Sequence, residues 1–221
     1  MQLSSVLLAR AIAIVDVNEL NPHGKIFLPT IIPHIVERFK FQKYPVKTED
    51  FDENKGIVFE EGYAGSTIAK LTLWSDGIGI DMRSSTEDAT EVLISALEWL
   101  KDEFELDYEP KKIKRWGYLS NLAFYSEADL DFLNPVLVRI CQRLDEMTTQ
   151  LGREGLHFKT AAVHLNFDRY FKQMPLAPFR IERSVGSPFS ENKYFSEAAL
   201  STALHLECLE MFEEEILGST S

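Results

Sequence analysis

The chain has 221 residues, of which 45% are hydrophobic, and its formal net charge is −12. The 15 Phe, 7 Tyr and 3 Trp exclude intrinsic disorder, because such a chain can bury enough apolar surface to fold. The acidic balance disfavours direct nucleic-acid binding, since phosphate is repelled, and two cysteines are too few for a disulfide framework.

The N-terminal segment 5–17 is apolar and gains β-branched residues toward its end, which predicts a strand. Arg10 interrupts this segment and Asp16 ends it, so the order of charges is not that of a secretory signal. No window reaches the roughly 18 apolar residues of a membrane span. Cys141 and Cys208 fall on predicted helices, as expected in a reducing compartment. The sequence therefore predicts a cytoplasmic protein without a membrane partner.

The next predicted elements are a short helix over 29–39, an exposed polar loop over 42–55 and a strand over 57–63. A hairpin follows, because Asp76-Gly77 lies between two alternating runs and is typical of a type I′ turn. That turn pairs Leu73 with Ile80 and Trp74 with Gly79. It places one set of apolar side chains on a common face: Leu71, Leu73, Ile80 and Met82.

Two long helices and another strand are predicted further along the chain. Ser84 and Glu87 have the spacing of a capping box for a helix over 85–106, and a strand is expected over 113–125. Asn134 is the expected N-cap of the second helix, with Gly152 just beyond its C-cap. This second helix is expected to bury one apolar stripe in the core: Leu137, Ile140, Cys141, Leu144, Met147 and Leu151.

The C-terminal part predicts two strands, over 156–168 and 178–185, a loop over 187–196, and a helix over 197–217 capped by Ser196. The element order predicts the α+β class. We expect a mainly antiparallel sheet of about six or seven strands, with three longer helices and one short helix packed on it. The whole chain, 1–221, is predicted to be a single domain, with a two-lobed arrangement (1–126 and 127–221) as the alternative.

The predicted strand over 156–168 carries the strongest candidate for chemistry. His164, Asn166 and Asp168 share one face of that strand, because residues two apart point the same way. An imidazole with a carboxylate can act as a general base and its orienting acid, so His164 and Asp168 are the candidate catalytic pair. Arg180 and Glu182 would join them if the next strand pairs alongside. The alternative is a solvated sheet face with ordinary cross-strand charge pairs.

A second candidate is the aromatic loop over 187–196, in which Tyr194 is a candidate ligand-binding residue. The five histidines show no metal-ligand spacing, and the chain has neither a nucleophile elbow nor a Gly-rich phosphate loop. No metal and no cofactor are therefore expected.

The absence of motifs favours a non-enzymatic binding or regulatory protein that acts through protein or small-ligand contacts and self-associates as a homodimer. The first alternative is a small hydrolase or nucleotide-acting enzyme using His164 and Asp168. The second is an acidic inhibitor that imitates nucleic acid. Glutamates at 207–215 crowd the end of the last helix, which is where a basic partner would bind.

Overall fold

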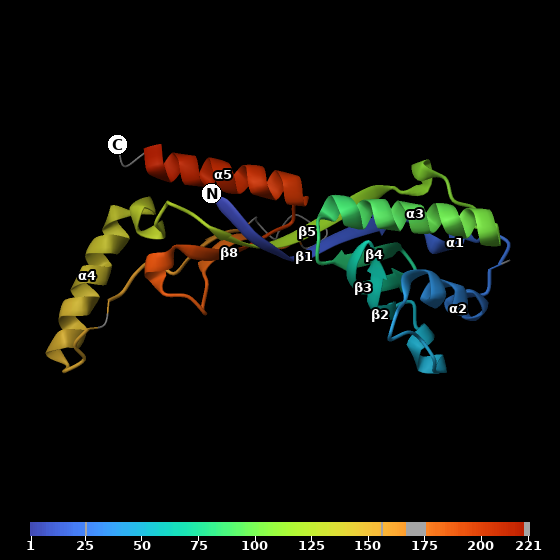
Figure 1. The fold of residues 1–221 in the computed structure, drawn as a ribbon, viewed down its shortest axis with the longest axis horizontal. Coiled ribbons are helices and arrows are strands. Elements are labelled where there is room, and N and C mark those ends of the chain that lie inside the picture. The colour runs from blue at the N-terminus through green and yellow to red at the C-terminus, as the bar shows by residue number, and fades with distance from the viewer. Residues whose placement is uncertain (25, 156, 167–175, 219–221) are drawn as a thin grey trace. The chain divides into compact units, whose positions relative to one another are not determined.

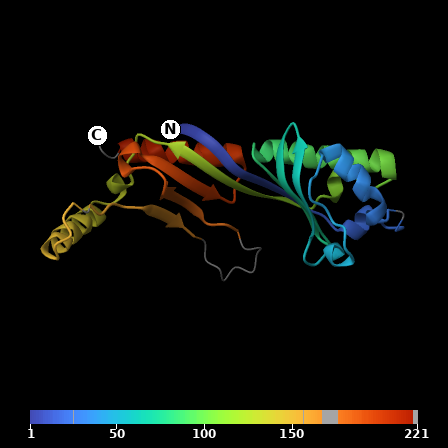
Figure 2. The ribbon, with the colours of Figure 1, turned by 60° about the horizontal axis from the view of Figure 1, so that its bottom comes forward.

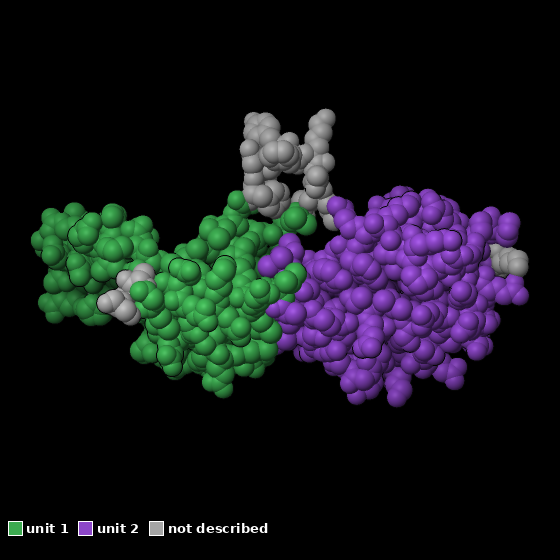
Figure 3. All heavy atoms as spheres, turned by 90° about the horizontal axis from the view of Figure 1, so that it is seen from above, with its two compact units in different colours: residues 1–5, 122–198, 204–221 green, residues 6–121, 199–203 purple. Residues whose placement is uncertain are grey.

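The fold, seen in a computed structural model, is α+β, as the sequence predicts (Figure 1). The structure describes residues 1–24, 26–155, 157–166 and 176–218. Within them, eight strands form one antiparallel sheet in the order β2-β3-β4-β1-β5-β8-β7-β6. The chain divides into two compact units, which Figure 3 colours separately. Unit 1 comprises residues 1–5, 122–198 and 204–221, and unit 2 comprises residues 6–121 and 199–203.

Unit 2 is a curled antiparallel sheet with helices that cover its apolar side (Figure 2). Its helices bury their apolar stripes against Ile57, Phe59, Ile80 and Met82 of the sheet, all of them 2% exposed or less. Its elements, with β1 and β5 also reaching into unit 1, are β1 (Gln2–Ile14), α1 (Val17–Leu20), α2 (Leu28–Phe39), β2 (Ile57–Ala64), β3 (Ser66–Trp74), β4 (Gly77–Met82), α3 (Thr86–Phe104) and β5 (Arg115–Tyr125).

The β3–β4 hairpin is present, but its predicted register is wrong by two residues. Trp74 pairs with Gly77 and Leu73 with Ile78, so the turn is Ser75-Asp76 and Gly77 already belongs to β4. Gly77 does not have the positive φ that a type I′ turn would require. A Cβ at this position would lie 3.1 Å from the carbonyl oxygen of Ala13, so the glycine allows two strands to pack closely. Because side chains alternate with a period of two, a shift of two leaves the predicted apolar face intact.

The capping box of α3 also lies one residue later than predicted. Ser85 is the N-cap and its side chain accepts a hydrogen bond from the Asp88 amide, while Asp88 receives the Ser85 amide in return. Arg10, which breaks the apolar run in the sequence, faces Asp81 across β1 and β4. The guanidinium makes a two-pronged contact with that carboxylate, at 2.6 and 2.7 Å.

Unit 1 contains an additional strand where the sequence predicts the end of a loop and the start of the last helix. Residues 193–198 form β8, paired with β7, because Tyr194, Ser196 and Ala198 alternate inward. Ser196 therefore lies in a strand and is not a helix cap, and the last helix begins at Thr202. The elements of this unit, besides parts of β1 and β5, are α4 (Pro135–Gln150), β6 (Ala162–Leu165), β7 (Phe179–Arg183), β8 (Lys193–Ala198) and α5 (Thr202–Gly218).

The helix α4 departs from the prediction in what its apolar stripe touches. Asn134 caps the helix as predicted, and Gly152 follows the C-cap with a φ of 77°. The stripe, however, is not in a core: no residue of α4 is buried, and Leu137 and Ile140 are 41% and 49% exposed. The spacing predicts an amphipathic helix correctly, but it carries no information on which surface covers the apolar face.

One residue of the acidic C-terminal cluster is an internal anchor. Glu213 is 8% exposed, and its carboxylate accepts hydrogen bonds from the Ser126 hydroxyl (2.6 Å), the Glu127 amide (2.9 Å) and the amino group of Met1. Burial alone would raise the pKa of this carboxyl, but these donors outweigh it and lower the pKa. Part of the negative charge counted in the sequence is therefore used to hold unit 1 together.

None of the helices in the described parts of the chain combines the length and the apolar character needed to cross a bilayer.

His205 predicts a pH-dependent stability. The imidazole is fully buried and its Nε2 lies 2.8 Å from the Ser196 hydroxyl, which itself donates to the Arg180 carbonyl. Burial lowers the pKa of His205 from 6.5 to about 4. Between pH 4 and pH 6.5, the His205 imidazole is therefore protonated in the unfolded chain and neutral in the folded chain. The free energy of unfolding should fall by about 3 kcal/mol as pH drops from 6.5 to 4, where this contribution is lost.

Urea unfolding at several pH values measures this slope. A His205→Gln variant should lose this component of the slope, because glutamine does not titrate. Equal slopes in the unaltered chain and the His205→Gln variant would contradict the assignment.

Candidate functional site

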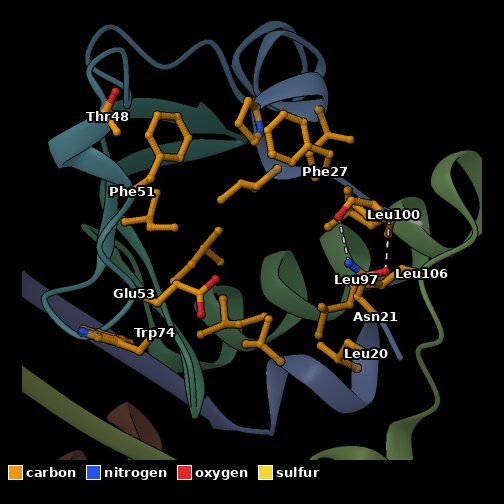
Figure 4. Close-up of a pocket in the computed structure, with 18 of the residues that line it drawn as sticks. Leu20, Asn21, Phe27, Thr48, Phe51, Glu53, Trp74, Leu97, Leu100 and Leu106 are labelled. Carbon is orange, nitrogen blue, oxygen red and sulfur yellow. Dashed lines mark hydrogen bonds between the residues drawn. The ribbon is translucent and has the colours of Figure 1, made fainter. Parts of the chain in front are cut away.

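Unit 2 contains a largely apolar cavity of about 590 Å³. This volume lies within the range of about 300–1,000 Å³ found for small-molecule pockets. Figure 4 shows side chains from several segments turned toward a common hollow. The described lining residues are Val17, Leu20, Asn21, Ile26, Phe27, Leu28, Pro29, Ile31, Val46, Thr48, Phe51, Glu53, Ile57, Leu73, Trp74, Ile78, Leu97, Leu100 and Leu106.

The inner part of the cavity belongs to the core. Leu20, Ile57, Ile78 and Leu97 line it and are 6% exposed or less, so the hollow reaches the packed interior between the sheet and α3. Two loops form its outer part. Phe27 and Val46 stand on these loops and are 65% and 75% exposed, which places two large apolar side chains in solvent beside the cavity.

Side-chain hydrogen bonds hold both loops in shape. The Asn21 amide nitrogen donates to the Ile26 carbonyl at 2.8 Å, and its oxygen accepts from the Ile26 amide at 3.1 Å, as the dashed lines of Figure 4 show. In the second loop, the Asp50 carboxylate accepts from the amides of Val46 (2.9 Å) and Lys47 (2.8 Å). These bonds, that of Lys47 first, lower the pKa of Asp50. The cavity is therefore bounded by loops with fixed local geometry.

Trp74 reaches the cavity because two glycines leave room for its indole ring. A Cβ on Gly56 would lie 2.7 Å from the indole nitrogen of Trp74, and one on Gly79 would lie 2.9 Å from the far edge of the ring. Gly56 also has a φ of 91°, which L side chains rarely adopt. Either side chain would displace the ring, so these glycines set the position of one cavity wall.

The polar content of the lining is small. Asn21 uses its amide to close its own loop, and Thr48 contributes a hydroxyl. Glu53 is the only described lining residue with an ionisable side chain, and Figure 4 shows its carboxylate turned toward the hollow. Among the described residues, no hydrogen bond or ion pair is formed by this carboxylate. A cavity of this kind can hold an apolar molecule, and the Glu53 carboxylate can accept a hydrogen bond from a polar group of that molecule.

The predicted catalytic strand lies in unit 1 rather than at this cavity. β6 and β7 pair as expected, with His164 opposite Arg180. His164 Nε2 lies 3.1 Å from a Glu182 oxygen, and the same oxygen lies 3.3 Å from the Arg180 guanidinium. The His164 side chain is 52% exposed. Three of the predicted residues thus meet in a half-exposed cross-strand charge cluster. Asp168 lies outside the described residues, so the predicted pair of His164 and Asp168 stays a prediction.

The remaining candidate residues have separate environments. Asn166 follows β6 and is exposed. Tyr194 is 1% exposed, and its hydroxyl lies 3.1 Å from the Ala128 carbonyl and 3.2 Å from the Asn192 side chain. The described residues contain no group of three or more His, Cys, Asp or Glu side chains arranged to hold a metal ion.

Sequence reasoning did not find the cavity, because its lining comes from many separate segments. Most lining residues belong to core stripes when viewed one element at a time. The usable signal was in the segment 42–55, where Val46 and Phe51 are apolar residues in an otherwise polar loop. No protein-family model matches the chain, and no curated protein resembles it closely enough in sequence to count as a relative.

Proposed function

We propose that this chain is a binding protein whose unit 2 holds a small, mainly apolar molecule with a cationic or hydrogen-bond-donating end. The observation that carries the proposal is the cavity of about 590 Å³, lined almost entirely by apolar side chains. Apolar pockets with a few polar groups are the usual form of a small-molecule site. The proposal fits the chain's lack of a nucleophile elbow and of a phosphate loop.

Glu53 favours one class of polar end group. Its carboxylate is the only ionisable group on the described lining, and the chain as a whole carries −12. Both features favour an ammonium or a neutral donor and work against a carboxylate or phosphate. Because Glu53 is exposed, its contribution to affinity should be that of a surface ion pair, about 1 kcal/mol or less, with the apolar contacts supplying the rest.

The matched ligands that test this are decylamine, decan-1-ol and decanoate, which share one chain and differ in the end group. Calorimetric titration of the full chain should give the tightest binding for the amine and the weakest for the carboxylate. Glu53→Gln should weaken amine binding by roughly fivefold and leave the alcohol unchanged. Equal affinities for amine and carboxylate would contradict the role of Glu53, and no binding of any of the three would contradict the site itself.

The control for this variant is Glu49→Gln. Glu49 is exposed on the same loop but does not line the cavity, so it makes the same change in net charge elsewhere. Amine binding by Glu49→Gln should equal that of the unaltered chain. A loss as large as that of Glu53→Gln would show that the overall charge of the protein, and not the Glu53 carboxylate, attracts the amine.

A second candidate function is acid–base catalysis in unit 1. The observation that favours it is the cluster of His164, Arg180 and Glu182.

We also propose a cytoplasmic location, which is supported by two free cysteines in a chain of this size. Direct binding to nucleic acid stays disfavoured by the charge of −12.

A further inference from the structure

The exposed apolar face of α4 has the periodicity of a helix–helix interface. Six apolar residues of α4 and its flanks, here called the α4 stripe, follow one another at intervals of four, three, four, three and four residues: Leu133, Leu137, Ile140, Leu144, Met147 and Leu151. This is the a/d pattern of a heptad repeat, in which each side chain inserts between residues of a facing helix.

Every member of the α4 stripe is accessible to solvent. Exposure ranges from 37% at Leu144 to 78% at Leu151. A continuous apolar stripe of this kind is unusual on a protein surface and marks an interaction site. The neighbouring Phe132 is 52% exposed and extends the apolar surface beyond the start of the helix.

The helix is held at Asp145, which lies outside the stripe. The Asp145 carboxylate accepts a hydrogen bond from the Phe158 amide at 2.7 Å and lies 3.3 Å from the His157 ring, so the returning chain is tied to α4. Thr148 and Thr149 hydroxyls bond to backbone carbonyls of their own helix. Because α4 is already formed and anchored, docking on the stripe would not require helix formation first.

The charges on α4 indicate which partner fits. Arg139 and Arg143 balance Asp145 and Glu146, so the helix is neutral within a chain of net charge −12. A second copy can therefore approach here without the repulsion that the rest of the chain imposes. In coiled coils, charged residues beside the apolar stripe determine which helices pair. Here only one of these flanking positions is charged. They are Asn134, Cys141 and Thr148 on one side, and Val136, Arg143 and Gln150 on the other.

We propose that the α4 stripe packs against the α4 stripe of a second copy of this chain and forms a two-fold symmetric dimer. A heptad stripe requires a facing helix with the same spacing, and this chain provides one itself. The single flanking arginine, Arg143, already has a partner in its own helix, Glu146 at 2.6 Å, so neither copy brings an unpaired cation to the contact. The interface goes beyond the ligand site of unit 2 and does not depend on it.

Size-exclusion chromatography with light scattering, run on the full chain under reducing conditions, tests the proposal. We expect a mass near twice the 25.3 kDa of one chain. The double variant Ile140→Glu/Leu144→Glu should give the mass of one chain. Both residues are exposed, so the variant should keep its far-ultraviolet circular dichroism spectrum. A single-chain mass for the unaltered protein at about 100 μM, or a dimeric double variant, would overturn the proposal.

The matched control is Gln142→Glu/Thr149→Glu. Both positions lie on the opposite side of α4, and the variant adds the same two negative charges. It should remain a dimer. If it dissociates as fully as the stripe variant, charge repulsion alone separates the copies and the stripe is not the contact.

Discussion

Replacing Arg183 by methionine should lower the free energy of unfolding by about 3–5 kcal/mol, the loss expected when one partner of a buried ion pair is removed. The Arg183 side chain is 2% exposed and its guanidinium pairs with Asp129. It also donates to the carbonyls of Thr160 (2.9 Å) and Phe189 (3.1 Å). The variant leaves these acceptors without their donor, in a place that water does not readily reach.

The remaining contacts of the guanidinium explain why lysine cannot replace it. The guanidinium lies over the rings of Phe189 (4.7 Å) and Tyr194 (5.5 Å). Because it also pairs with Asp129, this one group joins the loop before β8 to the segment before α4. Burial works against the charge of Asp129, but the Asp131 amide, Lys159 and Arg183 outweigh it and lower the pKa of that carboxyl. Arg183→Lys keeps the charge but not the fork of donors, and should recover only part of the loss.

Urea unfolding followed by circular dichroism measures the effect, with Arg153→Met as the control. Arg153 is an exposed arginine of the same unit, and its loss should cost less than about 0.5 kcal/mol. A cost below about 1 kcal/mol for Arg183→Met would show that the network does not stabilise unit 1.

Filling the cavity of unit 2 should abolish ligand binding without unfolding the protein. Leu73→Trp/Leu100→Trp adds bulk from β3 and α3, the sheet and helix walls of the cavity. Larger side chains usually strain a packed core, but here about 590 Å³ is open to receive them. We expect the affinity for decan-1-ol to fall by at least about 30-fold, while the free energy of unfolding changes by less than about 1.5 kcal/mol.

The control for this variant adds two tryptophans elsewhere. Leu3 and Leu7 lie on β1 and are 39% and 46% exposed, so Leu3→Trp/Leu7→Trp should bind decan-1-ol like the unaltered chain. If the filled variant also retains full affinity, the alcohol binds at another place, and the cavity is not the site.

The fold could be predicted from the sequence where the signals are local. Asn134 and Gly152 mark the ends of α4, and the alternation around Ser75-Asp76 identifies a hairpin with the correct apolar face. The register and the α3 cap were each misplaced, because several polar residues in a row offer competing turns and caps. β8 was missed because Pro188 and several hydroxyl residues precede it, and they indicate a loop more strongly than its alternation indicates a strand.

What could not be predicted depends on contacts between distant segments. The cavity joins loops near residues 26 and 46 to the end of α3, and no single segment contains its signature. The exposure of the α4 stripe is the same kind of result. Amphipathic spacing shows that Leu144 shares a face with Ile140, but only the tertiary structure shows that the chain leaves this face uncovered. The sequence did bring His164, Arg180 and Glu182 together, since strand alternation and one pairing suffice for that.

Calorimetric titration of the unaltered full chain with decan-1-ol tests the central claim most directly, because this probe has the apolar body without a charge. The cavity predicts saturable binding of one alcohol per chain with a negative heat-capacity change, as apolar surface leaves water. Heats that do not saturate, or that persist unchanged in Leu73→Trp/Leu100→Trp, would contradict the assignment of this cavity as a ligand site.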